Sequence, residues 1–301
     1  QYALRELPQG ATLIDAVRFY NRNYIPSSDA INISRALEQF LKNKEISSAK
    51  ATIIKYKSIV TRFIQLHGDM MLSSYTHEHV NDMIANCTPA YRNNILRHLG
   101  AFFSWCVKHK HCGSNPCDGV AKAKKVQAPL GILSVDEVEY LLHYAEVEMP
   151  HIVPYLAVGL FAGVRPQEML RMTANNIRNG YIVLDASITK TADARTIPIR
   201  DNLAQWLSRY AWQVPSDRQI KKCRAKTKTK INWSHDCLRH SFATYAYELT
   251  KDANLVASEM GHHGTKVFFT HYRALATPES GAKFFSITPK RKDSIHTPMQ
   301  I

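Results

Sequence analysis

A chain of 301 residues is longer than one typical domain and fits two. Hydrophobic residues make up 45% of it, which excludes a disordered or fibrous chain, and no apolar run of about 18 residues is present to span a membrane. Lysine and arginine exceed aspartate and glutamate by 39 − 25 = 14, and the pI is near 9.5. This excess favours a polyanion as partner, with nucleic acid first.

The six cysteines favour a cytoplasmic protein with reduced thiols, because the N-terminal residues lack the apolar core of a signal peptide. Cys106, Cys112 and Cys117 lie close to His109 in the sequence. Zinc binding by this cluster is the weaker interpretation. Trp105 and Cys106 continue the apolar face of a helix, where a free cysteine acts as a small hydrophobic residue. We therefore predict no metal and no cofactor.

The first 115 residues carry only helical patterns, with apolar residues recurring every three or four positions. Helices are expected over residues 11–24 and 31–43, from Ser47 or Ser48 to just before Gly68, from Thr76, and over residues 88–111. No segment with the two-residue period of a strand appears before residue 180. Residues 1–115 are therefore predicted to form an all-α domain.

A linker is expected at residues 116–133, because residues 113–131 hold glycine, proline and asparagine turn signals. It carries Lys122, Lys124 and Lys125. These lysines fit a segment that crosses a phosphate backbone, and they fit an ordinary solvated connection equally well.

The second domain is predicted over residues 134–288, followed by a tail at 289–301. Ser134 and Glu137 have the spacing of a capping box, and Gly163 ends a buried helix. Pro166 suits the first turn of the next helix. A small β-meander is expected from strands Tyr181–Leu184, Ser187–Thr191 and Arg195–Ile199, with turns at 185–186 and 192–193. The fold class is therefore two domains, mainly α, the second a mixed α/β domain.

Five residues of this domain have the chemistry for attack on a phosphodiester without a metal: Arg165, Lys190, Arg239, His262 and Tyr272. A guanidinium binds two phosphate oxygens at once, and a lysine can give a proton to a leaving oxygen. A tyrosine phenolate can act as the nucleophile. Each residue alone is more often structural: a paired or solvated cation, a polar loop histidine, a core tyrosine. The combination favours chemistry.

The motifs AGVRPQEML, ITKTADARTIPI, LRHSFAT, MGHH and THYRAL, in this order, resemble those of the tyrosine recombinase (phage integrase) family. The resemblance covers most of residues 134–288. It implies a SAM-like helical core-binding domain over 1–115 and a catalytic domain of the DNA breaking-rejoining fold, which together clamp duplex DNA. It also implies four protomers on two DNA sites, and a monomer when free.

By the same resemblance, Arg165 and Arg239 would hold the scissile phosphate and Lys190 would protonate the 5′-hydroxyl leaving group. His262 would hydrogen-bond the phosphate or assist proton transfer. Tyr272 would form the 3′-phosphotyrosyl link. Supporting positions match Glu168 and His240.

The chain departs from the family pattern at Asp236, where a histidine commonly lies three residues before the second arginine. A carboxylate cannot donate to a phosphate. Asp236 is therefore a site candidate with an open role: it could accept the proton of Tyr272 or orient a cation. His235 would reach the site only if the helix start is irregular.

DNA contacts are expected from residues 218–230, which carry seven cations and no acid, and from Arg92, Arg97, Lys108 and Lys110. The function predicted is a site-specific recombinase for integration or excision of a mobile element, working without metal or ATP. Two alternatives stay open. One is DNA relaxation of the type IB topoisomerase kind, and the other is a non-catalytic DNA-binding protein on a decayed recombinase fold.

Overall fold

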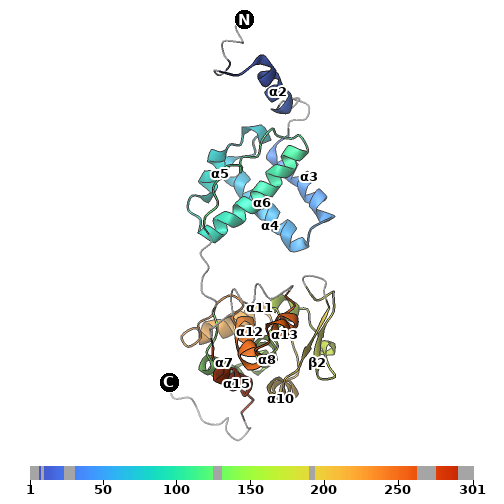
Figure 1. Cartoon of the computed structure of the whole chain (residues 1–301), viewed down its shortest axis with the longest axis vertical. Coiled ribbons are helices and arrows are strands. Elements are labelled where there is room, and N and C mark those ends of the chain that lie inside the picture. Colours follow the sequence, from blue (N-terminus) through green and yellow to red (C-terminus); the bar gives the residue numbers. More distant parts are fainter. Residues whose placement is uncertain are drawn as a thin grey trace. The chain divides into compact units, whose positions relative to one another are not determined.

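The computed structural model describes residues 7, 10–23, 31–124, 131–189, 194–262 and 276–290. The chain divides into two compact units, Gln1–Gln127 and Ala128–Ile301 (Figure 1). Each unit is described by itself. None of the helices in the described ranges is long and apolar enough to cross a membrane.

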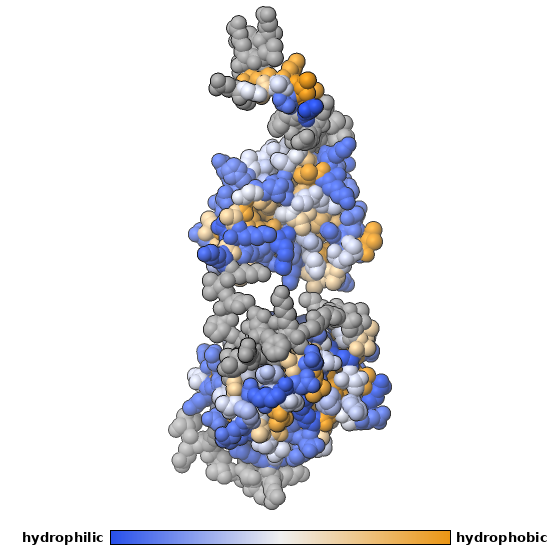
Figure 2. Space-filling view, in the orientation of Figure 1, coloured by the Kyte–Doolittle hydropathy of each residue, from blue (hydrophilic) through white to orange (hydrophobic). Residues whose placement is uncertain are grey.

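The first unit is all-α over its described residues, as predicted, and the mixed α/β class of the second is confirmed. The elements of the first unit are α2 (Leu13–Asn23), α3 (Ile33–Glu45), α4 (Lys50–His67), the 3₁₀ turn η1 (Leu72–Ser74), α5 (His77–Ile84) and α6 (Pro89–Lys108). Thr76 caps α5 as expected. Apolar side chains on α2 face solvent (Figure 2), where Leu13 is 54% and Ile14 is 63% exposed.

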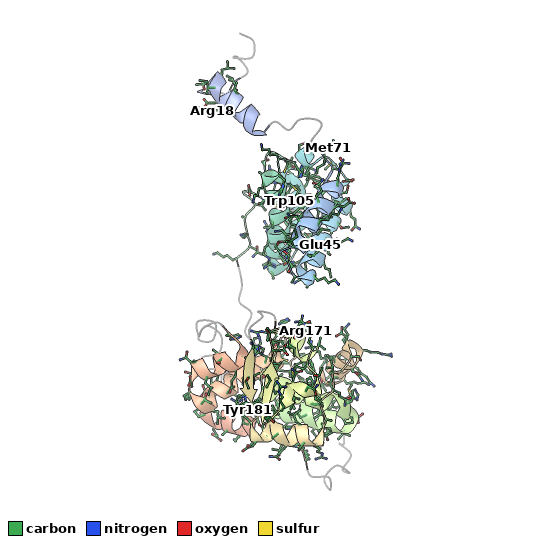
Figure 3. The ribbon with its side chains drawn as sticks, turned by 90° about the vertical axis from the view of Figure 1, so that its right-hand side faces the viewer. Arg18, Glu45, Met71, Trp105, Arg171 and Tyr181 are labelled. Carbon is green, nitrogen blue, oxygen red and sulfur yellow. The ribbon has the colours of Figure 1, made fainter. Side chains whose placement is uncertain are left out.

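Aromatic rings fill the core of the first unit. Phe102 on α6 meets Phe40 on α3 edge to face, with 5.4 Å between ring centroids. Trp105, one turn further along α6, also packs against Phe40 (Figure 3). Full burial of such a side chain is worth about 1.5–3 kcal/mol, so these contacts fix how α6 lies on α3.

The cysteines of the candidate cluster pack in and beside this core. Cys106 and Cys112 are buried, and burial raises the pKa of the Cys112 thiol to about 11. The pKa of Cys117 is raised to about 12 for the same reason. Protonated thiols are poor metal ligands, and the described residues contain no group of side chains arranged to hold a metal ion.

Arg92, one of the residues predicted to face DNA, holds the start of the linker together with its neighbour Asn93. Arg92 donates from Nε and Nη2 to the carbonyl of Ala121. Asn93 makes a two-way amide pair with the backbone of Ala123, at 2.9 Å in each direction. Arg97 remains exposed and donates to Asn94.

The second unit surrounds one fully buried helix, α8 (Val153–Phe161), which packs against α7, α10 and α12. Its helices are α7 (Val135–Glu148), η2 (Pro150–Ile152), α8, α9 (Pro166–Met169), η3 (Ala174–Asn176), α10 (Asp201–Arg209), α11 (Asp217–Thr227), α12 (Cys237–Thr250), α13 (Ala253–Met260) and α15 (Pro278–Phe285). The Ser134–Glu137 capping box is confirmed. Helix α15 packs on α12 through stacked rings of Phe284 and Tyr245.

The sheet differs from the predicted meander. It has the order β1 (Ile177–Arg178), β2 (Tyr181–Leu184) and β3 (Arg195–Pro198), all antiparallel, with Ile182 opposite Ile197. Tyr181 lies at the exposed start of β2 (Figure 3).

The expected strand at Ser187–Thr191 is wrong over its described residues. Asp185 accepts hydrogen bonds from Ser187, while the amides of Ile188 and Thr189 return to the Asp185 carbonyl, so the chain turns there. The missed first hairpin turns at Asn179-Gly180, both with positive φ. That pair is the strongest short hairpin signal in a sequence.

Two further boundaries concern candidate residues. Most of the basic run of residues 218–230 lies on helix α11, with Ser216 as its cap. Helix α12 begins at Cys237, because Asp236 before it adopts the left-handed conformation with φ of 56°. This bend sets the position of Asp236 relative to Arg239 on the first turn of α12.

Candidate active site

Arg239 is the centre of the cluster. It is 4% exposed, and its guanidinium donates to the carbonyls of Gly163 and Met260, the latter at 2.7 Å. Gly163 has φ of 61°, and a Cβ there would lie 2.3 Å from Phe242. Only glycine lets the chain between α8 and α9 approach α12 so closely.

His262 follows Gly261, the left-handed residue that ends α13, as the sequence predicted. Its Nε2 lies 2.9 Å from Nη2 of Arg239. Burial first, and then the charges of Arg239 and Arg165, lower the pKa of His262 to about 4. The ring is therefore neutral at pH 7. Since Arg239 can only donate, Nε2 accepts and Nδ1 carries the proton. Nδ1 is buried and has no hydrogen-bond partner among the described residues.

Arg165 reaches the same turn from α9. Its Nη2 donates to the Gly261 carbonyl at 2.7 Å, and its Nη1 donates to Glu168 at 2.9 Å. The side chain is 24% exposed, so Arg165 is partly accessible to a ligand. Arg165, Arg239 and His262, predicted from three separate motifs, are brought together by the backbone of residues 260–262.

Glu168 is the buried carboxylate of the cluster, at 1% exposed. Burial pushes its pKa up, but hydrogen bonds and charge from Arg195 and Arg165 outweigh burial and hold the pKa below its usual value. Arg195 donates to both oxygens of Glu168, at 3.1 and 2.5 Å.

Arg195 was missed as a site residue. The signal was present in the predicted strand, because Arg195 shares a face with the buried Ile197 two positions along. An arginine on the inner face of a strand requires a buried partner. The identity of that partner, Glu168, follows only from the fold.

The cluster is rich in guanidinium groups. Two guanidinium groups (165 and 195) bind the carboxylate of Glu168, and a third (239) binds the neutral ring of His262. Arg200 and Glu259 form a separate neutral pair at 2.8 Å. Several guanidinium groups gathered at one turn favour a ligand with negative charge, such as a phosphate.

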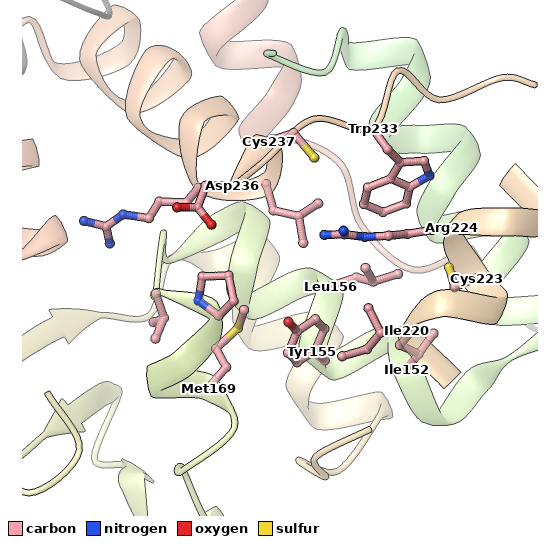
Figure 4. Close-up of a pocket in the computed structure, with 14 residues that line it drawn as sticks. Ile152, Tyr155, Leu156, Met169, Ile220, Cys223, Arg224, Trp233, Asp236 and Cys237 are labelled. Atoms are coloured by element: carbon pink, nitrogen blue, oxygen red, sulfur yellow. The ribbon is translucent and has the colours of Figure 1, made fainter. Parts of the chain in front are cut away.

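Asp236 lies beside this cluster. It shares a cavity of about 20 Å³ with Arg239, Pro166 and Met169 (Figure 4). Its carboxylate lies 3.3 Å from Nδ1 of His235, whose side chain is 93% exposed and points to solvent. The start of α12 is irregular, but the irregularity does not turn His235 into the site.

Lys190 and Tyr272 lie outside the described residues, so their roles remain predictions. His240 is half-buried and helps to lower the pKa of His262. On α11, Arg218, Lys221 and Lys222 are exposed, and Arg224 stacks on Trp233 with 5.0 Å to the ring centroid.

The chain is similar in sequence to one curated protein and in fold to several solved structures. No family model matches the chain. Over 263 residues it is 22% identical to tyrosine recombinase XerD of Lacticaseibacillus casei, covering 74% of this chain and 88% of that protein.

Solved structures share the fold at lower identity. A lambda integrase dimer bound to a COC′ core site superposes with a TM-score of 0.70 at 16% identity, over 92% of this chain and 86% of that one. A lambda integrase tetramer bound to a Holliday junction gives 0.69 at 17% identity, over 88% and 86%. The Tn1549 transposon integrase with transposon right end DNA gives 0.63 at 15%, over 84% and 98%.

The chain therefore shares the fold of the lambda and Tn1549 integrases, and the arginine–histidine cluster lies within that fold. In sequence the chain is similar to a curated tyrosine recombinase, which agrees with the resemblance carried by its motifs.

Proposed function

We propose that this chain is a site-specific tyrosine recombinase that cleaves and rejoins duplex DNA, for integration or excision of a mobile element. The observation that carries the proposal is the convergence of Arg165, Arg239 and His262 on the turn at Gly261. A non-catalytic protein on a decayed recombinase fold would be expected to have lost some of these side chains. Here all three are present and joined by hydrogen bonds, from Arg239 to His262 and from both arginines to the backbone just before His262.

In the proposed mechanism the scissile phosphate binds the accessible part of Arg165 beside Arg239. Guanidinium groups stabilise the charge that develops on the non-bridging oxygens in the pentacoordinate transition state. His262 donates its Nδ1–H to the same phosphate. It acts as a donor and not as a base, because Arg239 occupies Nε2 and the pKa of the ring is about 4.

Bond making and breaking are assigned to residues 190 and 272. The phenol oxygen of Tyr272 attacks phosphorus, the bond to the 5′ oxygen breaks, and Lys190 gives that oxygen its proton. The phenol proton passes to a base, for which Asp236 is the candidate. The phosphotyrosyl link keeps the energy of the broken phosphodiester, so rejoining needs no ATP, and the arginines take the place of a metal ion.

DNA contact is assigned to the exposed cations of α11 in the catalytic unit and to Arg97, Lys108 and Lys110 of the first unit. Lambda integrase is solved as a tetramer on a Holliday junction. We propose the same assembly here, four protomers on two DNA sites, formed from free monomers.

The test compares two reactions in EDTA without ATP. Plasmids carrying two copies of the chain's own DNA site should recombine, whereas a plasmid with one copy should not be relaxed at a comparable rate. Relaxation without recombination would favour the topoisomerase alternative. Strict dependence on magnesium would contradict the metal-free mechanism.

A further inference from the structure

Arg195 connects the two sides of the cluster. From the first residue of β3, its side chain extends under the turn at Gly261 and is 8% exposed. We infer that Arg195 is a positioning residue: it keeps the side chains of Arg165 and His262 in the positions from which both can bind the phosphate. The inference deepens the proposed function, and its activity readout rests on it.

The first connection runs through Glu168. Nη1 and Nη2 of Arg195 bind the two carboxylate oxygens separately, at 3.1 and 2.5 Å, which fixes the plane of the carboxylate. The same carboxylate accepts Nη1 of Arg165 and also its backbone amide. The orientation of the Arg165 fork is therefore set by a carboxylate that Arg195 holds.

The second connection runs through the end of α13. Nε of Arg195 donates to the carbonyl of Glu259 at 3.0 Å. A Cβ on Gly261 would lie 3.1 Å from Cδ of Arg195, so the arginine stem fills the space against this turn. Gly261 in turn offers its carbonyl to Arg165 and precedes His262. One side chain thus supports both phosphate-binding groups.

Arg195 acts through these neighbours and not on the phosphate. Its Nε, Nη1 and Nη2 atoms are all engaged by protein acceptors. In contrast, Arg165 is 24% exposed on its side chain. A shift of about 1 Å in a positioned group can cost about 10²-fold in rate, even when the mutated residue is remote from the reacting atoms.

The test uses Arg195→Gln, Arg195→Lys and the matched control Arg200→Gln in the full chain. Arg200 is also a partly buried arginine, and its Nη2 donates to both carboxylate oxygens of Glu259 and not to Glu168. At saturating protein, Arg195→Gln should slow formation of the covalent DNA complex about 10²-fold, with DNA affinity within about twofold. Arg195→Lys should recover part of the rate, because it keeps one charged contact. Arg200→Gln should lose comparable thermal stability and keep most of the rate.

Two readouts separate positioning from general stability. The rate effects of Arg195→Gln and Arg165→Ala should be less than additive, because Arg195 acts through Arg165.

The pH dependence of cleavage should change too. Loss of Arg195 raises the pKa of Glu168, so as the pH is lowered, the Arg195→Gln variant should lose cleavage activity at a higher pH than the unaltered protein. Arg165, the other charged group that binds this carboxylate, is present in both proteins. Additive effects and an unshifted profile would overturn the inference.

Hydrogen exchange in the free protein tests the same inference without any reaction. Arg195→Gln should speed amide exchange in residues 163–169 and 259–262 together, and Arg200→Gln should leave 163–169 unchanged. Unchanged exchange in 163–169 in the Arg195 variant would overturn the inference. Absence of a covalent complex with the unaltered protein would instead refute the proposed function, and the exchange result would still decide the role of Arg195.

Discussion

Nη2 of Arg239 lies 2.9 Å from Nε2 of His262, so an arginine on α12 fixes the tautomer of the histidine that follows α13. Because arginine has no acceptor, the bond forms only with the neutral ring. The relationship has consequences for stability as well as for catalysis.

The first prediction concerns pH. The pKa of His262 is about 4 in the folded protein, against 6.5 for an ordinary histidine. Between these values the unfolded chain binds a proton that the folded protein does not, so the free energy of unfolding falls as pH drops from 6.5 towards 4. His262→Gln should lose less stability than the unaltered protein between about pH 7 and pH 5, measured by urea unfolding. His235→Gln, at an exposed position, should behave as the unaltered protein. Equal pH dependence in all three would contradict the buried neutral ring.

The second prediction concerns the charge of Glu168. Glu168→Gln keeps the shape but leaves Arg165 and Arg195 without their anion, and loss of one partner of a buried pair costs about 3–5 kcal/mol. The measurement is the free energy of unfolding. Glu279→Gln breaks an exposed pair with Lys283 and should have no measurable effect. A mild effect of Glu168→Gln would show that the arginines do not depend on it.

The third prediction concerns close packing at Gly163. Gly163→Ala places a Cβ 2.3 Å from Phe242 at a left-handed residue, and should cost about 2–4 kcal/mol. It should also move the carbonyl that Arg239 uses. Gly180→Ala has a similar φ of 76° but open space around it, so it should cost about 1–2 kcal/mol. Thermal unfolding of both variants tests the difference, and equal costs would contradict it.

The fourth prediction concerns Asp236. Its left-handed φ is adopted by aspartate, asparagine and histidine more readily than by most residues. Asp236→His should therefore fold and cleave DNA, and it restores the residue common in the family. Asp236→Asn keeps the shape and removes the proton acceptor, and general-base loss lowers rate by about 10²–10⁴-fold. Inactive Asp236→His would show that aspartate has a role of its own. Full activity of Asp236→Asn would remove it as the base.

Local patterns predicted most of the elements of this chain and much of its cluster. Capping at Ser134 and Thr76 and the glycine after α13 were readable because each depends on neighbours within four residues. The Asn179-Gly180 turn was equally local and was overlooked in favour of a strand at 187–191, where Asp185 bends the chain.

What the sequence could not supply was contact between distant segments. The spacing of motifs indicated Arg165, Arg239 and His262, but not that carbonyls 163, 260 and 261 join them. Arg195 was readable as an inward strand residue, yet its partner lies 27 positions away in the chain. The left-handed bend at Asp236 uses a residue type that tolerates positive φ, but an aspartate alone does not predict such a bend.

The most direct test of the account is covalent capture. A pool of nicked duplexes with random sequence is incubated with the protein in EDTA, and complexes that survive denaturation are recovered and sequenced. The unaltered protein should capture one family of sequences through a phosphotyrosyl link at Tyr272, and Tyr272→Phe should capture none. Capture that persists in Tyr272→Phe, or a link mapped to another residue, would contradict the account.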